Sequence, residues 1–361
     1  MLKHWFLCIF MCFSLVAHAD QTVDLYRIMV PVEDQTTKSR EVGIDNAFSK
    51  MLVKITGNSR ILQSPQLKPF LTDPKAFLDS VGFSQLSNAI SDDSVATLLD
   101  VRFDRPSVDK LLKQAQLPII PAIRPKFLVW LLVDDIDQGR RVVHESMAQQ
   151  VHSSDYLSEL INAFDQSMQA RAVSYFFPSY DLEDQLSLSL NEAWSLEKDP
   201  IESASQRYAA DGWFAIRVFK ASNGQIRGAL AYQHAGKRQM DDFHGDDLGD
   251  LIELSVNQIM DIMLQSYTYV PQLETDKLLV QIDGVGSFKN YQAVMKQLEQ
   301  LELVEALQLY SVNRGELVVA IDINGRADLL HAELLGTGIV TPHLSSDNRS
   351  IGRLTYRWAG Q

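Results

Sequence analysis

The sequence predicts a mixed α/β protein of the α+β class, made of two N-terminal α/β blocks and a smaller C-terminal block. Strand-like apolar runs alternate with amphipathic helical segments, which is typical of domains that combine sheets with helices. A chain of 361 residues is long enough for about two or three domains. The clearest order of elements lies in residues 277–361, and this segment therefore predicts a domain of its own.

The first block is expected over residues 20–125. Gly57-Asn58 ends its main helix in a common way, and Ser107 is the expected N-terminal cap of its second helix. Apolar residues at helical spacing or in alternation mark the elements. The expected elements are a strand at 25–32, a helix at 38–56, a strand at 96–103 and a helix at 107–115.

The central block is expected over residues 126–271. Phe127–Val133 is a continuous apolar run, which is typical of a central strand buried on both faces. Asn223-Gly224 is a strong signal for a hairpin between two strands. The expected strands are 127–133, 141–145, 173–177, 212–219 and 225–233, and the expected helices are 155–172, 201–210 and 248–267.

The C-terminal block covers residues 277–361. The expected strands are 278–282, 304–312, 317–323 and 354–358, and the expected helices are 287–301 and 326–335. This order, strand-helix-strand-strand-helix-strand, is the ferredoxin-like arrangement. Because that arrangement supports many unrelated functions, it assigns none.

The first 19 residues predict a cleavable secretory signal. A basic start at Met1–His4 precedes an apolar core, and Ala17-His18-Ala19 has the small-residue pattern of a cleavage site. The core is shorter than the roughly 20 apolar residues that a membrane span needs. An uncleaved anchor is the alternative, but the chain turns polar at once from Asp20. We therefore expect a soluble exported protein without a membrane span.

Composition excludes several functions. Both cysteines, Cys8 and Cys12, lie in the expected signal, so the mature chain has no thiol for a disulfide, a metal site or a nucleophile. The formal net charge of −13 disfavours nucleic acid as a partner, because a negative surface repels phosphates.

Four segments carry a resemblance to a known family: LYRIMVPVEDQTTKSRE, KITGN, RPKFLVWLLVDD and FFPSYDLED. They resemble an exported gamma-proteobacterial family of unknown function, the one numbered two-zero-six-six. The resemblance covers most of the mature chain and has no catalytic motif. It implies a periplasmic protein of a Gram-negative cell and supplies no activity.

The central block has a second, weaker resemblance. FFPSYDLED and SASQRYAADGWFAIRVF are similar to α/β domains of periplasmic envelope factors, such as the outer-membrane activators of peptidoglycan synthases and the N-terminal domain of the Tol-system propeller protein. Those domains bind other proteins. The resemblance implies a protein partner in the cell envelope.

Three motifs contain residue types that can form metal or cofactor sites. The acidic run Asp241–Asp247 has metal-binding residue types, but it precedes a helix that Asp246 or Asp247 would cap. Asp134–Gly139 lacks oxygen ligands of a calcium loop, and Gly284-Val285-Gly286 lacks the third glycine of a dinucleotide fingerprint. We therefore predict no catalytic residue, no cofactor and no metal ligand.

The remaining candidate is Trp194, which lies in a polar setting and could be an exposed anchor for a protein partner. Trp130 and Trp213 are expected in the core. The predicted function is a non-enzymatic adaptor or scaffold of the cell envelope. The alternative is a periplasmic enzyme or small-ligand-binding protein with a site between the first two blocks, since a catalytic triad need not be local in sequence.

Overall fold

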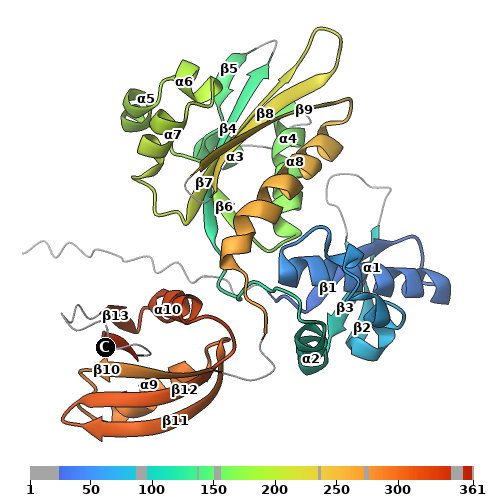
Figure 1. Cartoon of the computed structure of the whole chain (residues 1–361). Coiled ribbons are helices and arrows are strands. Elements are labelled where there is room, and N and C mark those ends of the chain that lie inside the picture. The colour runs from blue at the N-terminus through green and yellow to red at the C-terminus, as the bar shows by residue number, and fades with distance from the viewer. Residues whose placement is uncertain are drawn as a thin grey trace, which may run out of the picture.

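The computed structural model describes residues 24–86, 96–135, 138–149, 156–234, 237–271, 276–342 and 353–359. The expected signal, residues 1–19, lies outside these ranges. The described chain is a mixed α/β structure with three sheets. Figure 1 shows the central block above the other two blocks, which lie side by side. Within the described ranges, no helix has the length and apolar character needed to cross a membrane.

The first sheet is antiparallel, with the strand order β1-β3-β2, and α1 packs against it. The elements are β1 (Arg27–Val32), α1 (Thr37–Thr56), β2 (Leu78–Leu86), β3 (Ala96–Phe103) and α2 (Arg105–Ala115), with short 3-10 turns η1 (Ile61–Gln63), η2 (Lys68–Phe70) and η3 (Pro74–Phe77). The two predicted helices and two predicted strands are therefore present. Strand β2 was not predicted, because serine, glycine and glutamine interrupt its apolar residues.

The predicted cap of α2 was wrong. The helix begins two residues earlier than expected, and the carboxylate of Asp104 accepts the backbone N–H of Ser107 (3.0 Å). Pro106 lies in the first turn, where its missing N–H costs nothing. Ser107 is therefore inside the helix and is the capped residue.

The central sheet has the strand order β5-β4-β7-β8-β9, with β6 beside β4. Its strands are β4 (Lys126–Asp135), β5 (Gly139–Val142), β6 (Ser174–Phe176), β7 (Gly212–Lys220), β8 (Ile226–His234) and β9 (Lys237–Gly245). β4 runs parallel to β6 and β7, and the other pairs are antiparallel. Figure 1 shows helices on both sides of this sheet.

Those helices explain why β4 is apolar along its length. Phe127, Val129 and Leu131 pack in the cluster that includes α4 (Tyr156–Gln169) and α8 (Leu248–Met263). Leu128 and Trp130 face the opposite cluster, under α5 (Leu182–Ser187), α6 (Leu190–Trp194) and α7 (Lys198–Ser205). Trp130 also donates its indole N–H to Ser205 (2.9 Å). The predicted burial of both faces is confirmed.

The acidic run of the central block belongs to a strand that the sequence did not predict. Asp241 and Asp242 lie in β9, where successive side chains point to opposite faces of the sheet. Asp247 accepts the N–H of Asp250 (2.8 Å) and is the N-terminal cap of α8, as predicted. The short helix α3 (Glu145–Gln149) and the 3-10 turn η4 (Leu264–Tyr267) complete the central block.

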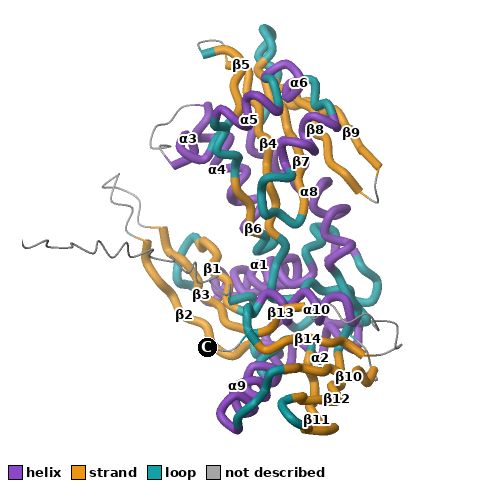
Figure 2. Tube along the Cα trace, turned by 90° about the vertical axis from the view of Figure 1, so that its left-hand side faces the viewer, coloured by secondary structure: helices purple, strands orange, loops and turns teal. Residues whose placement is uncertain are grey.

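The C-terminal sheet has the order β11-β12-β10-β14-β13. Its elements are β10 (Asp276–Asp283), α9 (Phe288–Glu299), β11 (Val304–Asn313), β12 (Glu316–Ile323), α10 (Ala327–Gly336), β13 (Val340–Pro342) and β14 (Arg353–Trp358). Figure 2 shows α9 lying beside this sheet.

This topology extends the expected ferredoxin-like order and corrects its last strand. The pairings make β13 parallel to β12, so β13 is the strand that returns after α10. The strand expected to close the domain, β14, instead enters between β10 and β13 and runs parallel to β10. A simple six-element reading omits β13, because that strand has only three residues.

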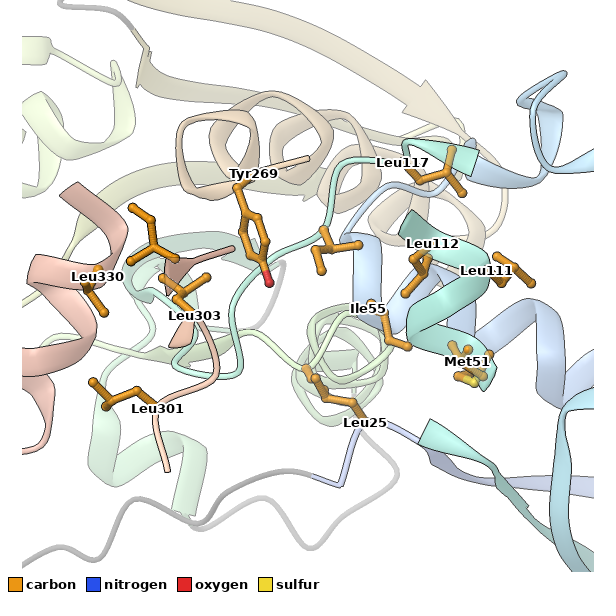
Figure 3. Close-up of a cluster of buried hydrophobic side chains, with 14 of the residues drawn as sticks. Leu25, Met51, Ile55, Leu111, Leu112, Leu117, Tyr269, Leu301, Leu303 and Leu330 are labelled. Carbon is orange, nitrogen blue, oxygen red and sulfur yellow. The ribbon is translucent and has the colours of Figure 1, made fainter. Parts of the chain in front are cut away.

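The first and third blocks share one hydrophobic cluster. Tyr269 lies between them, with Leu112 and Leu117 on one side and Leu303 and Leu330 on the other (Figure 3). The backbone of Tyr269 also exchanges two hydrogen bonds with Ile119 (2.8 and 2.9 Å). The segment that leaves the central block is therefore part of the packing between the other two blocks.

A buried polar contact joins the first block to the central block. Arg171 is 1% exposed, and its guanidinium donates to the carbonyl of Gly57 (3.1 Å) and to Asp261 (3.4 Å). Asp261 also accepts the N–H (3.0 Å) and the hydroxyl (2.8 Å) of Ser59. These side chains fill the junction with paired polar groups.

Candidate protein-interaction site

The helices α5, α6 and α7 form one layer on the central sheet (Figure 1). Their buried residues pack against Leu128, Trp130 and Leu132 of β4. The buried residues of the layer are Ala193, Ile201 and Ala204 in α6 and α7, and Leu188 and Leu196 just after α5 and α6. The layer begins with the FFPSYDLED segment, and the RYAAD segment follows it in the chain.

Asp184 in this layer is a fully buried carboxylate, with 0% of the residue exposed. One oxygen accepts the backbone N–H of Tyr180 (2.8 Å) and the hydroxyl of Tyr208, and the other accepts Arg207 (3.0 Å). A buried acid is tolerated when hydrogen bonds replace those it loses from water. Asp184 meets this requirement with donors on both oxygens.

Arg207 connects Asp184 to the surface. Its two terminal nitrogens donate to the two oxygens of Asp181 (2.6 and 2.9 Å), which is the bidentate geometry that suits a guanidinium. Hydrogen bonding to Arg207 lowers the pKa of Asp181 to about 2. The same hydrogen bond raises the pKa of Arg207. The pair therefore stays charged at physiological pH.

These contacts fix the start of α5. Asp181 caps the helix by accepting the N–H of Asp184 (3.1 Å). Tyr180 has a φ of 51°, a left-handed conformation that is uncommon for a residue with a side chain. Its N–H binds Asp184, and its carbonyl accepts the side chain of Gln185 (2.9 Å). The network holds this strained turn in place.

Two leucines are exposed on α5, beside the polar side chains of Glu183 and Gln185. Leu182 is 71% exposed and Leu186 is 80% exposed. They are four residues apart, so both side chains lie on the same side of the helix. We call these two leucines the α5 leucines. The α5 leucines form a small apolar patch on a helix whose start is fixed by a buried acid.

Trp194 lies on the same layer, at the end of α6, and is partly buried. The guanidinium of Arg140 is 4.6 Å from the centre of its ring, and that of Arg217 is 5.9 Å away. Arg217 also donates to the carbonyl of Trp194 (2.9 Å). The structure thus places Trp194 among cations of β5 and β7, where cation–π attraction fixes the ring. Trp194 was predicted to be an exposed anchor, and in the structure its side chain is half-buried.

The other sequence candidates do not come together at this site. Gly284 has a φ of 90° and lies in a turn. The backbone N–H of Val285 donates a hydrogen bond to the carbonyl of Gly315 (2.8 Å). His144 contacts Ser146 (2.9 Å), and His331 contacts Tyr356 (2.7 Å). His152 and His343 lie outside the described residues, as does the side chain of His234. In the described ranges, no group of three or more His, Cys, Asp or Glu side chains is placed to hold a metal ion.

The two segments that form this site were singled out in the sequence, but the buried position of Asp184 was not predicted. The quoted segments contain Asp184, Arg207 and Tyr208, yet nothing local marks Asp184 as buried. Its partners Arg207 and Tyr208 lie 23 and 24 residues away. The sequence showed an acidic segment around Asp184 and the pair Arg207-Tyr208, but only the fold brings the two together.

Part of the chain matches a known family model. A family described as a domain of unknown function (DUF8605) matches residues 19–121. The match covers the first block and supports an uncharacterised domain family there. No curated protein matches the chain.

Comparison with solved structures gives a distant similarity. A structure titled "Crystal structure of uncharacterized protein" aligns over 40% of this chain and 98% of its own, with 9% identity and a TM-score of 0.16. A score this low supports no argument about fold or function.

Proposed function

We propose that this chain is an exported, periplasmic adaptor that binds another envelope protein through the α5 leucines. The observation that carries the proposal is the exposure of Leu182 and Leu186 on a helix that buried Asp184 holds in place. A partner that covered the two leucines would remove their apolar surface from water, which favours binding. The resemblance of this segment to protein-binding envelope domains points the same way.

The charges around the leucines define the partner's chemistry. Asp181 and Glu183 flank Leu182, and their side chains are 47% and 69% exposed. Both pair with Arg207, whose single positive charge leaves this border with a net negative charge. An acidic border favours a partner whose apolar residues lie next to lysine or arginine. Such a border affects association rate and specificity more than affinity, so salt should slow binding.

Export rests on the N-terminal sequence. The basic start, apolar core and Ala17-His18-Ala19 support a signal cleaved before Asp20. Periplasmic localisation is tested by fractionating cells that carry a tagged chain. Recovery in the cytoplasm at full length would contradict it.

The alternative function, a ligand site between the first two blocks, receives less support. Arg171, Asp261 and Ser59 fill that junction with mutual hydrogen bonds. A cavity of about 620 Å³ lies within the central block and is lined by Phe127, Tyr208, Asp211, Trp213 and Tyr267, among others. All of its lining residues belong to the central block.

The test is crosslinking in intact cells, followed by mass spectrometry of the captured proteins. The wild-type chain should capture one envelope protein reproducibly. The double variant Leu182→Ser/Leu186→Ser should lose most of this capture, by about tenfold or more if each leucine buries its side chain. The chain should remain folded, because both side chains already face water.

Leu254→Ser is the matched control. Leu254 is 62% exposed on α8, across the central sheet from α5, and should be replaceable without effect on capture. Equal capture by wild-type and double-variant chains, with folding intact by circular dichroism, would overturn the proposal. Trp194→Ala tests whether the interface extends to α6.

A further inference from the structure

The cavity of about 620 Å³ in the central block lies at the end of the sheet where the parallel strands β4 and β7 begin. Ser205 lines it at the end of α7, and Met263 and Tyr267 line it at the ends of α8 and η4. Figure 1 shows α7 and α8 on opposite sides of the central sheet. Small-molecule sites have volumes of about 300–1,000 Å³. The cavity is therefore large enough to hold a small ligand.

The charged side chains that line the cavity are acidic. Glu202 and Asp211 belong to the lining, and the described part of the lining contains no lysine, arginine or histidine. The ends of α7 and α8 add partial negative charge, because the last carbonyls of a helix have no partner within it. Lys198 is 3.6 Å from Glu202, but such a partly exposed pair contributes little. The cavity therefore favours a cation over an anion.

Aromatic rings form much of the remaining surface, and those in the described lining belong to Phe127, Tyr208, Trp213 and Tyr267. Tyr267 donates its hydroxyl to the carbonyl of Asp211 (3.0 Å), and its ring meets that of Phe127 edge to face at 6.2 Å. The hydroxyl of Tyr208 donates to Asp184. Because both hydroxyls already donate within the protein, the two tyrosines offer a ligand mainly their rings. Aromatic ring faces attract cations.

Two serines of the lining also use their hydroxyls within the protein. Ser205 donates to the carbonyl of Ile201 (2.7 Å). Ser266 donates to the carbonyl of Met263 (3.1 Å). Asp211 differs from them, because one of its carboxylate oxygens accepts a backbone N–H of β4 (2.8 Å) and the other has no partner among the described residues. A ligand with a positive charge therefore gains more in this cavity than a neutral polar ligand does.

We propose that this cavity binds a small organic cation, an amine or a quaternary ammonium. Its carbon groups pack against the aromatic rings, and Glu202 and Asp211 balance its charge. A calcium or magnesium ion fits less well, because such an ion takes about six or more oxygen ligands, and a lining rich in aromatic rings does not supply them. This site is separate from the α5 leucines, neither of which lines the cavity.

Calorimetric titration of the chain expressed from Asp20 tests the proposal. One ligand is choline, and the other is the neutral alcohol of the same shape, in which carbon replaces the ammonium nitrogen. Choline should bind at least about tenfold more tightly than the alcohol, because only choline gains from the rings and the acids as a cation. Equal binding of the two ligands, or no binding of choline, would overturn the proposal.

The variant Glu202→Gln/Asp211→Asn removes both charges and nearly preserves the shape of the lining. Choline should bind to it about as weakly as the alcohol does. Glu253→Gln/Glu299→Gln is the matched control, since it removes two charges at exposed positions that do not line the cavity. This control should bind choline like the wild type. If both variants lost choline binding equally, the attraction would come from the net charge of the chain, and the cavity would not be the site.

A third variant separates this proposal from the proposed function. Leu182→Ser/Leu186→Ser should bind choline as the wild type does, because the α5 leucines are not part of the lining. Unchanged choline binding in this variant, whether or not partner capture is lost, supports the cavity as a separate site. Loss of choline binding, with circular dichroism unchanged, would place the choline contact on α5 and contradict the proposal.

Discussion

At the scale of single residues, Asp184 decides how α5 is presented. Both of its oxygens accept hydrogen bonds from donors, namely Tyr180, Tyr208 and Arg207. No rotation of an asparagine in its place would satisfy all of these donors, because one of its two oxygens becomes a donating NH₂ group. The carboxylate is therefore required by its surroundings rather than merely tolerated by them.

We expect Asp184→Asn to destabilise the chain by about 1–3 kcal/mol, the cost of leaving a buried donor without its acceptor. The measurement is urea unfolding followed by circular dichroism. Asp181→Asn is the control, since Asp181 is exposed and its loss should cost less. If the two variants were equally stable, the buried network would not be what holds α5 in place.

At the scale of elements, the end of α1 depends on Gly57. This residue has a φ of 68°, and a Cβ atom added to it would lie 2.2 Å from the side chain of Ile120. Its carbonyl also accepts Arg171 of the central block (3.1 Å). The helix therefore ends at a position where three segments of the chain meet with no room for a side chain.

Gly57→Ala should cost more stability than Gly139→Ala. Both glycines have nearly the same φ, 68° and 69°, but Gly139 has open space around its Cα. The left-handed backbone alone costs about 1 kcal/mol for alanine, and the collision with Ile120 adds to it only at Gly57. The difference between the two unfolding free energies isolates the packing contribution. Equal losses would show that the Ile120 side chain simply moves aside.

At the scale of the whole molecule, Glu302 lies where the first and third blocks meet. Its carboxylate accepts the backbone N–H of Ala122. Burial raises the pKa of Glu302, and the hydrogen bond from Ala122 and the charges of Arg124 and Arg105 only partly oppose this. The folded chain therefore binds the Glu302 proton more tightly than the unfolded chain does. Stability from this group is greatest at low pH and is lost as pH rises through the raised pKa.

Glu302→Gln should be more stable than the wild type at neutral pH, because glutamine keeps an acceptor for Ala122 and carries no buried charge. The gain should shrink as pH falls toward the unfolded pKa of glutamate, and urea unfolding at pH values between about 4 and 8 would reveal it. Glu299→Gln, at an exposed position of α9, controls for net charge. A variant less stable than wild type at neutral pH would mean that Arg124 and Arg105 outweigh burial.

Local patterns determined most of the elements. The continuous apolar run of β4 made that strand predictable, because its side chains fill a core on each face of the sheet. Apolar residues at helical spacing made α1, α4 and α8 predictable. Asn223-Gly224 marked the β7–β8 turn, where Gly224 has a φ of 86°. These features are encoded within one element, because they depend on which faces are buried and on which residues tolerate a turn.

Only the tertiary structure decided how distant segments meet. Strand β9 is edge-placed and rich in charge, so its apolar alternation was too weak to read. The insertion of β14 beside β10 depends on pairing between residues more than seventy positions apart. Burial of Asp184 likewise depends on Arg207 and Tyr208, which reach it from the turn that follows α7. The sequence by itself determined elements whose burial pattern is local, while the site and the topology depend on contacts that form only when those elements pack.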